Sequence, residues 1–166
     1  LMDGNPDNVL MAVGLTLVLG LSVGLIHAFF INELNLSPFV VTFASLFILQ
    51  GISLTITTKP IGRSSKDFLL LYSQKVFEVP VIVYFFGLLT LLIAFLLRMT
   101  VFGKYIYAVG GNLTVAELSG VPVKKVRYGV YGLCSLLAAV TGLLWLMRMG
   151  VGDPVIGKEL ELNAII

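Results

Sequence analysis

Four long apolar stretches without a single Asp, Glu, Lys or Arg divide the sequence. They cover residues 8–32, 34–58, 79–97 and 128–147. An α-helix needs ~20 residues to cross the hydrocarbon core of a bilayer, and each stretch is about that long. Only helices and closed barrels satisfy their backbone in lipid, and these stretches lack the alternation of barrel strands. The pattern therefore predicts four membrane-spanning helices, at residues 9–31, 38–57, 80–97 and 128–147.

Polar and charged residues gather in two longer links and in the tail. We expect residues 65–73, within the link at 58–79, to form a short interfacial helix. The link at 98–127 carries five of the eleven basic residues. Acidic Asp3 and Asp7 precede the first span, where a signal peptide would be basic. We read residues 1–166 as a single transmembrane domain that is a fragment of a longer protein.

Composition narrows the class of protein. The chain is 58% apolar and 12% charged, with a mean hydropathy of +1.01, whereas soluble domains are roughly 45–50% apolar and about 25% charged. A soluble fold could not bury so much apolar surface, and such a composition also excludes disorder. Cys134 is the only cysteine, which excludes a disulfide scaffold, and a net charge of +2 is too small to indicate nucleic acid. The prediction is an all-α integral membrane protein.

The basic residues do not orient the predicted spans. The positive-inside rule assigns the side richer in Lys and Arg to the cytoplasm. One side holds Lys59, Arg63, Lys66, Lys75, Arg148 and Lys158, and the other holds Arg98, Lys104, Lys124, Lys125 and Arg127. Charge counting alone therefore leaves the orientation open.

Small residues recur four positions apart in the first and fourth spans. Such rows let two membrane helices approach closely. They are Gly20, Gly24 and Ala28 in the first span, and the pairs Ser135/Ala139 and Ala138/Gly142 in the fourth. These rows predict a packed bundle rather than isolated anchors, and they say nothing about a substrate.

The second span carries a polar stripe with aromatic residues beside it. At 100° per residue its polar members fall within an arc of about 140°. They are Thr42, Ser45, Gln50, Ser53 and Thr57, with Phe39, Phe43 and Phe47 within or beside the arc. Hydroxyl, amide and aromatic groups suit a pathway for a polyhydroxylated solute. The alternative is that the hydroxyls bond to carbonyls of their own helix or to a neighbour.

His27 is the only histidine and lies in a charge-free stretch. An ionisable group inside a membrane indicates a functional site by default. The spans offer no carboxylate with which His27 could form a proton relay. We therefore favour a neutral, hydrogen-bonded histidine over a functional one.

The link at 98–127 contains the signals of a short capped helix. Thr114 followed by Glu117 fits a capping box, with Leu113 and Leu118 in the staple positions. A helix at residues 115–119 would then close at Gly120, before Pro122. Gly110 and Gly111 would let the chain turn sharply into it. So short a helix is not stable alone, so we expect it to dock either on its own protein or on a partner.

Residues 102–112, together with Ala116 and residues 118–121, resemble the cytoplasmic loop of sugar-type ABC importer permeases. These are the ribose, xylose and galactofuranose transporters of bacteria. Residues 37–42, Gly51, and residues 152–154 and 161–165 also fit the family pattern. The chain departs from it at Asn163, where the family usually has Asp, and at Glu117, where Arg or Lys is usual.

The resemblance implies a polytopic helical bundle of the ABC importer permease type in the bacterial cytoplasmic (inner) membrane. Residues 98–127 would be cytoplasmic, and the short helix would be the coupling helix that contacts a separate ATPase subunit. The link at 58–79 would face a solute-binding protein outside. The implied ATPase-coupling residues are Gly110, Gly111, Asn112, Thr114, Ala116, Glu117, Leu118, Ser119 and Gly120.

The same resemblance implies further partners and no chemistry in this chain. A second permease subunit, identical or homologous, would complete the pathway, for which Phe39, Thr42, Ser45, Gln50 and Ser53 are candidates. The sequence lacks a Walker A loop, so ATP and Mg would be bound by the ATPase, and this chain would need no cofactor.

Alternative functions differ in solute or in class. A permease of the same family could import a nucleoside, an autoinducer or a branched-chain amino acid, but the neutral stripe offers no charge to pair with an amino acid. A membrane-embedded enzyme would need paired ionisable residues in the spans. A purely structural membrane protein would not need the capped helix. We therefore predict a monosaccharide permease subunit.

Overall fold

The computed structural model describes residues 9–60, 75–76, 78–154 and 157. Four of its helices are long and apolar enough to cross a membrane, which confirms the predicted number of spans. In chain order the elements are α1 (Val9–Glu33), α2 (Pro38–Ile56), β1 (Lys75–Val76), β2 (Val79–Pro80), α4 (Val81–Met99), α5 (Val101–Gly111), α6 (Leu113–Leu118) and α7 (Val123–Met149).

The helix bounds follow the charge-free stretches closely except in the last span. The bounds of α1, α2 and α4 lie within two residues of the predicted spans. In contrast, α7 begins at Val123, five residues before the predicted start, so Lys124, Lys125 and Arg127 form part of the helix. The charge-free stretch begins where the chain enters the membrane core. The helix itself begins earlier, directly after Pro122.

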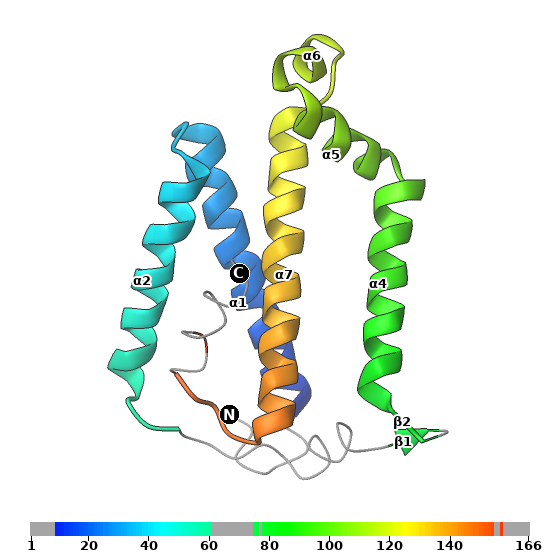
Figure 1. Cartoon of the computed structure of the whole chain (residues 1–166). Helices are drawn as coiled ribbons and strands as arrows, with labels where there is room; N and C mark the ends of the chain where they lie inside the picture. The colour runs from blue at the N-terminus through cyan, green and yellow to red at the C-terminus, as the bar shows by residue number, and fades with distance from the viewer. Residues whose placement is uncertain (1–8, 61–74, 77, 155–156, 158–166) are drawn as a thin grey trace.

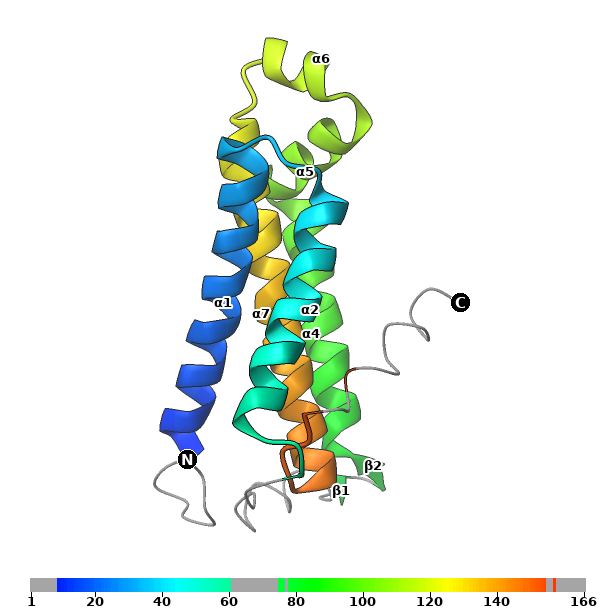
Figure 2. The same ribbon diagram turned by 90° about the vertical axis from the view of Figure 1, so that its left-hand side faces the viewer.

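The four long helices run in alternating directions, with α7 between α1 and α4 (Figures 1 and 2). At one end α5 and α6 connect α4 to α7, and α6 projects beyond the bundle (Figure 1). The small antiparallel pair β1 and β2 lies at the other end. The main contacts of α4 are with α5 and β2, so α4 stands apart from α1 and α2.

The most extensive helix contact, between α1 and α7, is made by small residues. A Cβ atom at Gly20 would lie 2.6 Å from the Cβ of Ala139, and one at Gly24 would overlap Ser135 Oγ. Ala28 is fully buried. Gly20 and Gly24 of the predicted row therefore pack on the Ser135/Ala139 pair. The second pair, Ala138/Gly142, is exposed and lies outside this interface.

The turn between α1 and α2 fits its residues. Pro38 is the first residue of α2, where its missing amide hydrogen leaves no gap in the helix. Asn35 adopts a φ of 51°, a left-handed conformation that Asn tolerates better than most residues. The expected interfacial helix at 65–73 and the motif at 161–165 lie outside the described residues.

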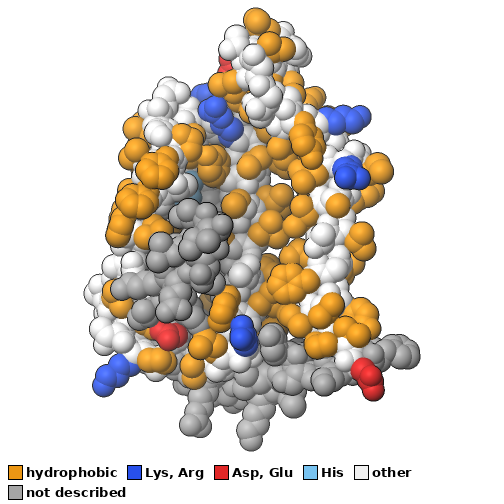
Figure 3. Space-filling model, in the orientation of Figure 1, with side chains coloured by type: hydrophobic (Ala, Val, Ile, Leu, Met, Phe, Trp, Pro, Cys, Tyr) orange, Lys and Arg blue, Asp and Glu red, His pale blue; other side chains and the backbone are white. Residues whose placement is uncertain are grey.

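Apolar side chains cover the middle of the bundle, and the Lys and Arg side chains lie toward its two ends (Figure 3). Large apolar side chains such as Leu10, Phe39, Leu91 and Phe95 are 65–85% exposed. Lipid rather than water would surround such a surface. Together with the four spanning helices, this surface makes the chain an all-helical integral membrane protein.

Candidate functional site: the α5–α6 segment and the face of α2

Helix α5 was not predicted, and close contacts hold it between α4 and α7. Thr100 caps it, since its hydroxyl accepts a hydrogen bond from the Gly103 amide at 3.2 Å. A Cβ atom at Gly103 would overlap the backbone of Leu97. The Phe102 ring lies over Gly129 of α7, where a Cβ would be 2.6 Å from the ring. These contacts fix the base from which α6 projects.

Asn112, rather than Thr114, caps α6. The Asn112 side chain accepts a hydrogen bond from the Val115 amide at 3.1 Å. The helix therefore begins at Leu113 and ends at Leu118, and the predicted capping box and the bounds 115–119 are wrong. Thr114 and Glu117 lie within the helix and are exposed. Asn is among the most favoured N-cap residues, so the sequence did contain this signal.

The glycines around α6 divide into one that terminates a helix and two that do not form the expected turn. Gly120 has a φ of 78° and closes α6 as predicted. Its amide donates to the Glu117 carbonyl at 3.0 Å. Gly110 and Gly111, however, are the last residues of α5 and have no positive φ. The chain turns at Asn112, which is extended, with a φ of −152° and a ψ of 112°.

The exposed surface of α6 combines apolar and polar side chains. Ala116 is 3% exposed, and α6 contacts the start of α7. Leu118 is 84% exposed and Val115 57%, beside the exposed Glu117. Thus the structure brings the predicted coupling residues from Asn112 to Gly120 together on a small exposed element, while Gly110 and Gly111 lie at its base.

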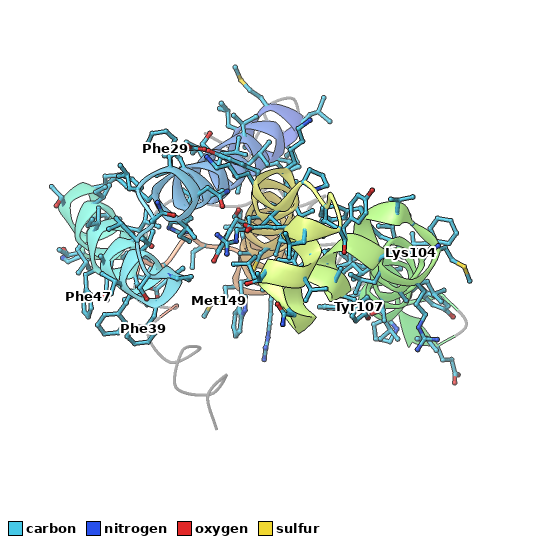
Figure 4. The ribbon with its side chains drawn as sticks, turned by 90° about the horizontal axis from the view of Figure 1, so that it is seen from above. Phe29, Phe39, Phe47, Lys104, Tyr107 and Met149 are labelled. Atoms are coloured by element: carbon cyan, nitrogen blue, oxygen red, sulfur yellow. The ribbon has the colours of Figure 1, made fainter. Side chains whose placement is uncertain are left out.

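The polar stripe of α2 is mostly half-buried, and the aromatic residues beside it are exposed. Phe39 and Phe47 lie on the side of α2 turned away from α1 (Figure 4). The Thr42 hydroxyl donates to the Pro38 carbonyl at 2.9 Å, and Ser45 Oγ donates to the Thr42 carbonyl at 2.8 Å. Two of the stripe's hydroxyls thus bond to their own helix. Gln50 and Ser53 are half-buried and form no side-chain hydrogen bond with any other described residue.

A cavity of about 360 Å³ lies between α1 and α2. His27 and Ser45 face it, and its other lining residues are apolar: Val23, Ile26, Phe30, Leu36, Val40, Val41, Ala44, Ile48 and Leu49. Ser45 is the only pathway candidate among them. His27 Nε2 lies 2.8 Å from Ser45 Oγ, which confirms the expected hydrogen-bonded histidine.

Within the described part of the chain, His, Cys, Asp and Glu form no group of three that could hold a metal ion. The four apolar helices define a multi-pass membrane protein, from one end of which the short helix α6 projects. Residues 1–166 match the family of branched-chain amino acid transport system permease components. The chain belongs to this family.

The chain is similar to several curated permeases. The ribose import permease protein RbsC of Escherichia coli K12 is 31% identical over 167 residues, which cover 98% of this chain and 52% of RbsC. The D-allose transport system permease protein AlsC of the same strain is 31% identical, over 99% of this chain and 51% of AlsC. The xylose transport system permease protein XylH of Haemophilus influenzae is 39% identical, over 52% of this chain and 23% of XylH.

No solved structure matches the chain. The chain spans about half the length of RbsC and AlsC. The family match and these relatives confirm the resemblance found in residues 102–121. All three of these relatives are named as permease proteins.

Proposed function

We propose that the chain forms half of the membrane-spanning permease subunit of an ATP-driven importer and that α6 docks on its ATPase. The observation that carries this proposal is the exposed, capped α6 at one end of the bundle. A helix of six residues is too short to be stable alone. The Asn112 cap, the Gly120 turn and buried Ala116 hold its shape, while Val115 and Leu118 remain open to a partner.

The orientation follows from this docking. With α6 in the cytoplasm, the Arg98 and Lys104 end of the bundle is cytoplasmic, and the end with β1 and β2 faces outward. A solute-binding protein would deliver its cargo there. A second permease subunit would complete the pathway in the bacterial inner membrane.

Transport then depends on mechanical coupling, because this chain carries out no chemical step. ATP, with Mg, binds to the separate ATPase subunits and draws them together. Helix α6 moves with the ATPase, and α5 and α7 transmit the movement because Phe102 and Gly129 hold them together. The pathway then opens toward the other side of the membrane.

We propose a monosaccharide as the solute. RbsC, AlsC and XylH are named for ribose, allose and xylose. The polar stripe of α2 is neutral, and hydroxyl or amide groups at Thr42, Gln50 and Ser53 suit sugar hydroxyls. The family description favours branched-chain amino acids as the second candidate. Such a solute would need partners for an ammonium and a carboxylate, and α2 contains no charged residue.

Co-purification tests the docking of α6. The full-length permease carrying Glu117→Arg and Leu118→Asp should lose its ATPase subunit during purification. Thr58→Arg with Lys59→Asp introduces the same residue types at the opposite end of the bundle and should retain the ATPase. If the ATPase stays bound to the α6 variant, the docking assignment is wrong.

A separate measurement tests the solute. The partner binding protein is titrated with pentoses, hexoses and branched-chain amino acids, and uptake is measured with the solute that binds. Gln50→Ala should then lower uptake or change solute selectivity, with Thr55→Ala, exposed on the same helix, as the control. Unchanged uptake and selectivity in Gln50→Ala would remove the main support for the α2 pathway.

A further inference from the structure

The end of α1 and the start of α7 meet at the end of the bundle from which α6 projects. Asn32 and Glu33, the last two residues of α1, both contact Lys124 of α7. The Asn32 side-chain amide donates to the Lys124 carbonyl at 3.3 Å. Lys124 Nζ donates to the Glu33 carboxylate at 2.9 Å. Consecutive residues of one helix thus hold the backbone and the side chain of a single residue of the other.

A short hydrogen-bonded segment connects this junction to α6. The Val121 amide donates to the Ala116 carbonyl at 3.0 Å, and the Val123 amide donates to the Val121 carbonyl at 2.8 Å. Ala116, Val123 and Val126 are all buried. The segment between α6 and Lys124 is therefore held by its own bonds and packing, and a displacement of α6 also moves Lys124.

Stability alone does not account for the junction. The Lys124 and Glu33 side chains are 65% and 40% exposed, and exposed ion pairs contribute little to folding. Asn32 is 4% exposed, yet its Oδ1 atom has no partner among the described residues. A buried polar atom without a partner opposes folding. The three residues therefore combine a weak stabilising contact with a destabilising one.

The rest of the α1–α7 interface provides close packing, whereas the junction at Lys124 provides polar contacts. Gly20 and Gly24 bring the two helices into close contact. Among the described residues no hydrogen bond joins the two helices along this row, so the row resists sliding along the helix axes by shape alone. The polar contacts to Lys124 act at one fixed point along α7, so they resist that sliding.

We propose that Asn32 and Glu33 are positioning residues for transport, which hold α1 to Lys124 so that α1 follows α6 when the ATPase moves it. This inference rests on the proposed function, because it requires an ATPase docked on α6. From α1 the movement reaches α2 through the hydrogen bond between His27 and Ser45.

The test uses the full-length permease reconstituted into proteoliposomes with its ATPase and binding protein. Solute uptake and ATP hydrolysis are measured in parallel. Glu33→Lys and Lys124→Glu should each lower the solute imported per ATP hydrolysed at least fivefold, without loss of the bound ATPase. The double reversal, Glu33→Lys with Lys124→Glu, should restore that ratio to within twofold of the unmodified protein. A residue that served only to stabilise the fold would change the amount of protein, not this ratio.

Two further variants complete the test. Lys125→Glu makes the same charge change one residue further along α7 and should leave the ratio unchanged. Glu33→Gln removes the charge at an exposed position and keeps the test available if a reversal does not fold. An unchanged ratio in Glu33→Gln and both reversals, or a double reversal no better than either single one, would overturn the inference. An ATPase that stays bound after α6 is altered would instead overturn the proposed function.

Discussion

His27 Nε2 of α1 and Ser45 Oγ of α2 lie 2.8 Å apart inside the membrane-spanning part of the bundle. Ser45 Oγ also lies 2.8 Å from the Thr42 carbonyl, to which only the hydroxyl can donate. With the Ser45 proton donated to the Thr42 carbonyl, His27 Nε2 carries the proton of the bond between the helices. This bond is the polar contact in an otherwise apolar cavity wall.

Ser45→Ala should lower the free energy of unfolding by about 1 kcal/mol, because it leaves the His27 donor without an acceptor. The measurement is reversible unfolding of the purified permease in detergent. In a double-mutant cycle, His27→Phe combined with Ser45→Ala should give a coupling energy of about 0.6 kcal/mol. A coupling energy of zero would show that the contact contributes nothing.

Gly24→Ala should lower the free energy of unfolding by about 1–3 kcal/mol, because the added methyl group has no space against α7. The Ser135 side chain could rotate, but the Tyr131 carbonyl, 2.5 Å from the added Cβ, belongs to the helix backbone. Gly14→Ala is the matched control, because a Cβ at Gly14 in the same helix meets nothing within 4 Å. Equal effects of the two substitutions would contradict the α1–α7 packing.

Asn112→Ala should open the first turn of α6. Loss of an N-cap costs about 1 kcal/mol, which corresponds to roughly fivefold faster amide hydrogen exchange in α6. Asn112→Asp should keep the slower rate because Asp is an equally good cap. Thr114→Ala should leave exchange unchanged. Faster exchange in that variant would show that Thr114, as the sequence predicted, caps the helix.

Phe102→Ala should loosen α5 from α7. Phe102 is half-buried over Gly129, so its truncation should cost about 2 kcal/mol, less than for a fully buried ring. Phe95→Ala removes a ring of α4 that is 65% exposed to the membrane and should cost much less. Thermal denaturation in detergent compares the two, and a similar loss in both would indicate that Phe102 does not fix α5.

The membrane spans could be predicted because a charged side chain is excluded from the membrane core, whatever the rest of the fold. The row Gly20, Gly24 and Ala28 also identified its interface, since close packing needs small residues. In contrast, α5 was missed because Gly110 and Gly111 suggest a turn locally. Packing against Leu97 and Gly129 determines that segment, and this information lies outside its own sequence.

The sequence predicted some features of the candidate site and not others. The short exposed helix and its Gly120 end were identified from local signals, but two cap patterns overlapped and the wrong one was chosen. The Asn32 contact with Lys124 joins residues 92 positions apart and follows no local periodicity. The pathway stripe remains a prediction, since the structure brings only Ser45 into the cavity between α1 and α2.

Photo-crosslinking from α6 tests the central claim most directly. The full-length permease carries p-benzoylphenylalanine in place of Leu118, which is 84% exposed, and is irradiated in membranes that contain the ATPase and the binding protein. The same substitution at Leu88, 66% exposed in the middle of α4, is the control and should give no adduct with the ATPase. We expect an adduct between position 118 and the ATPase. An adduct with the binding protein, or none with the ATPase, would contradict the docking of α6.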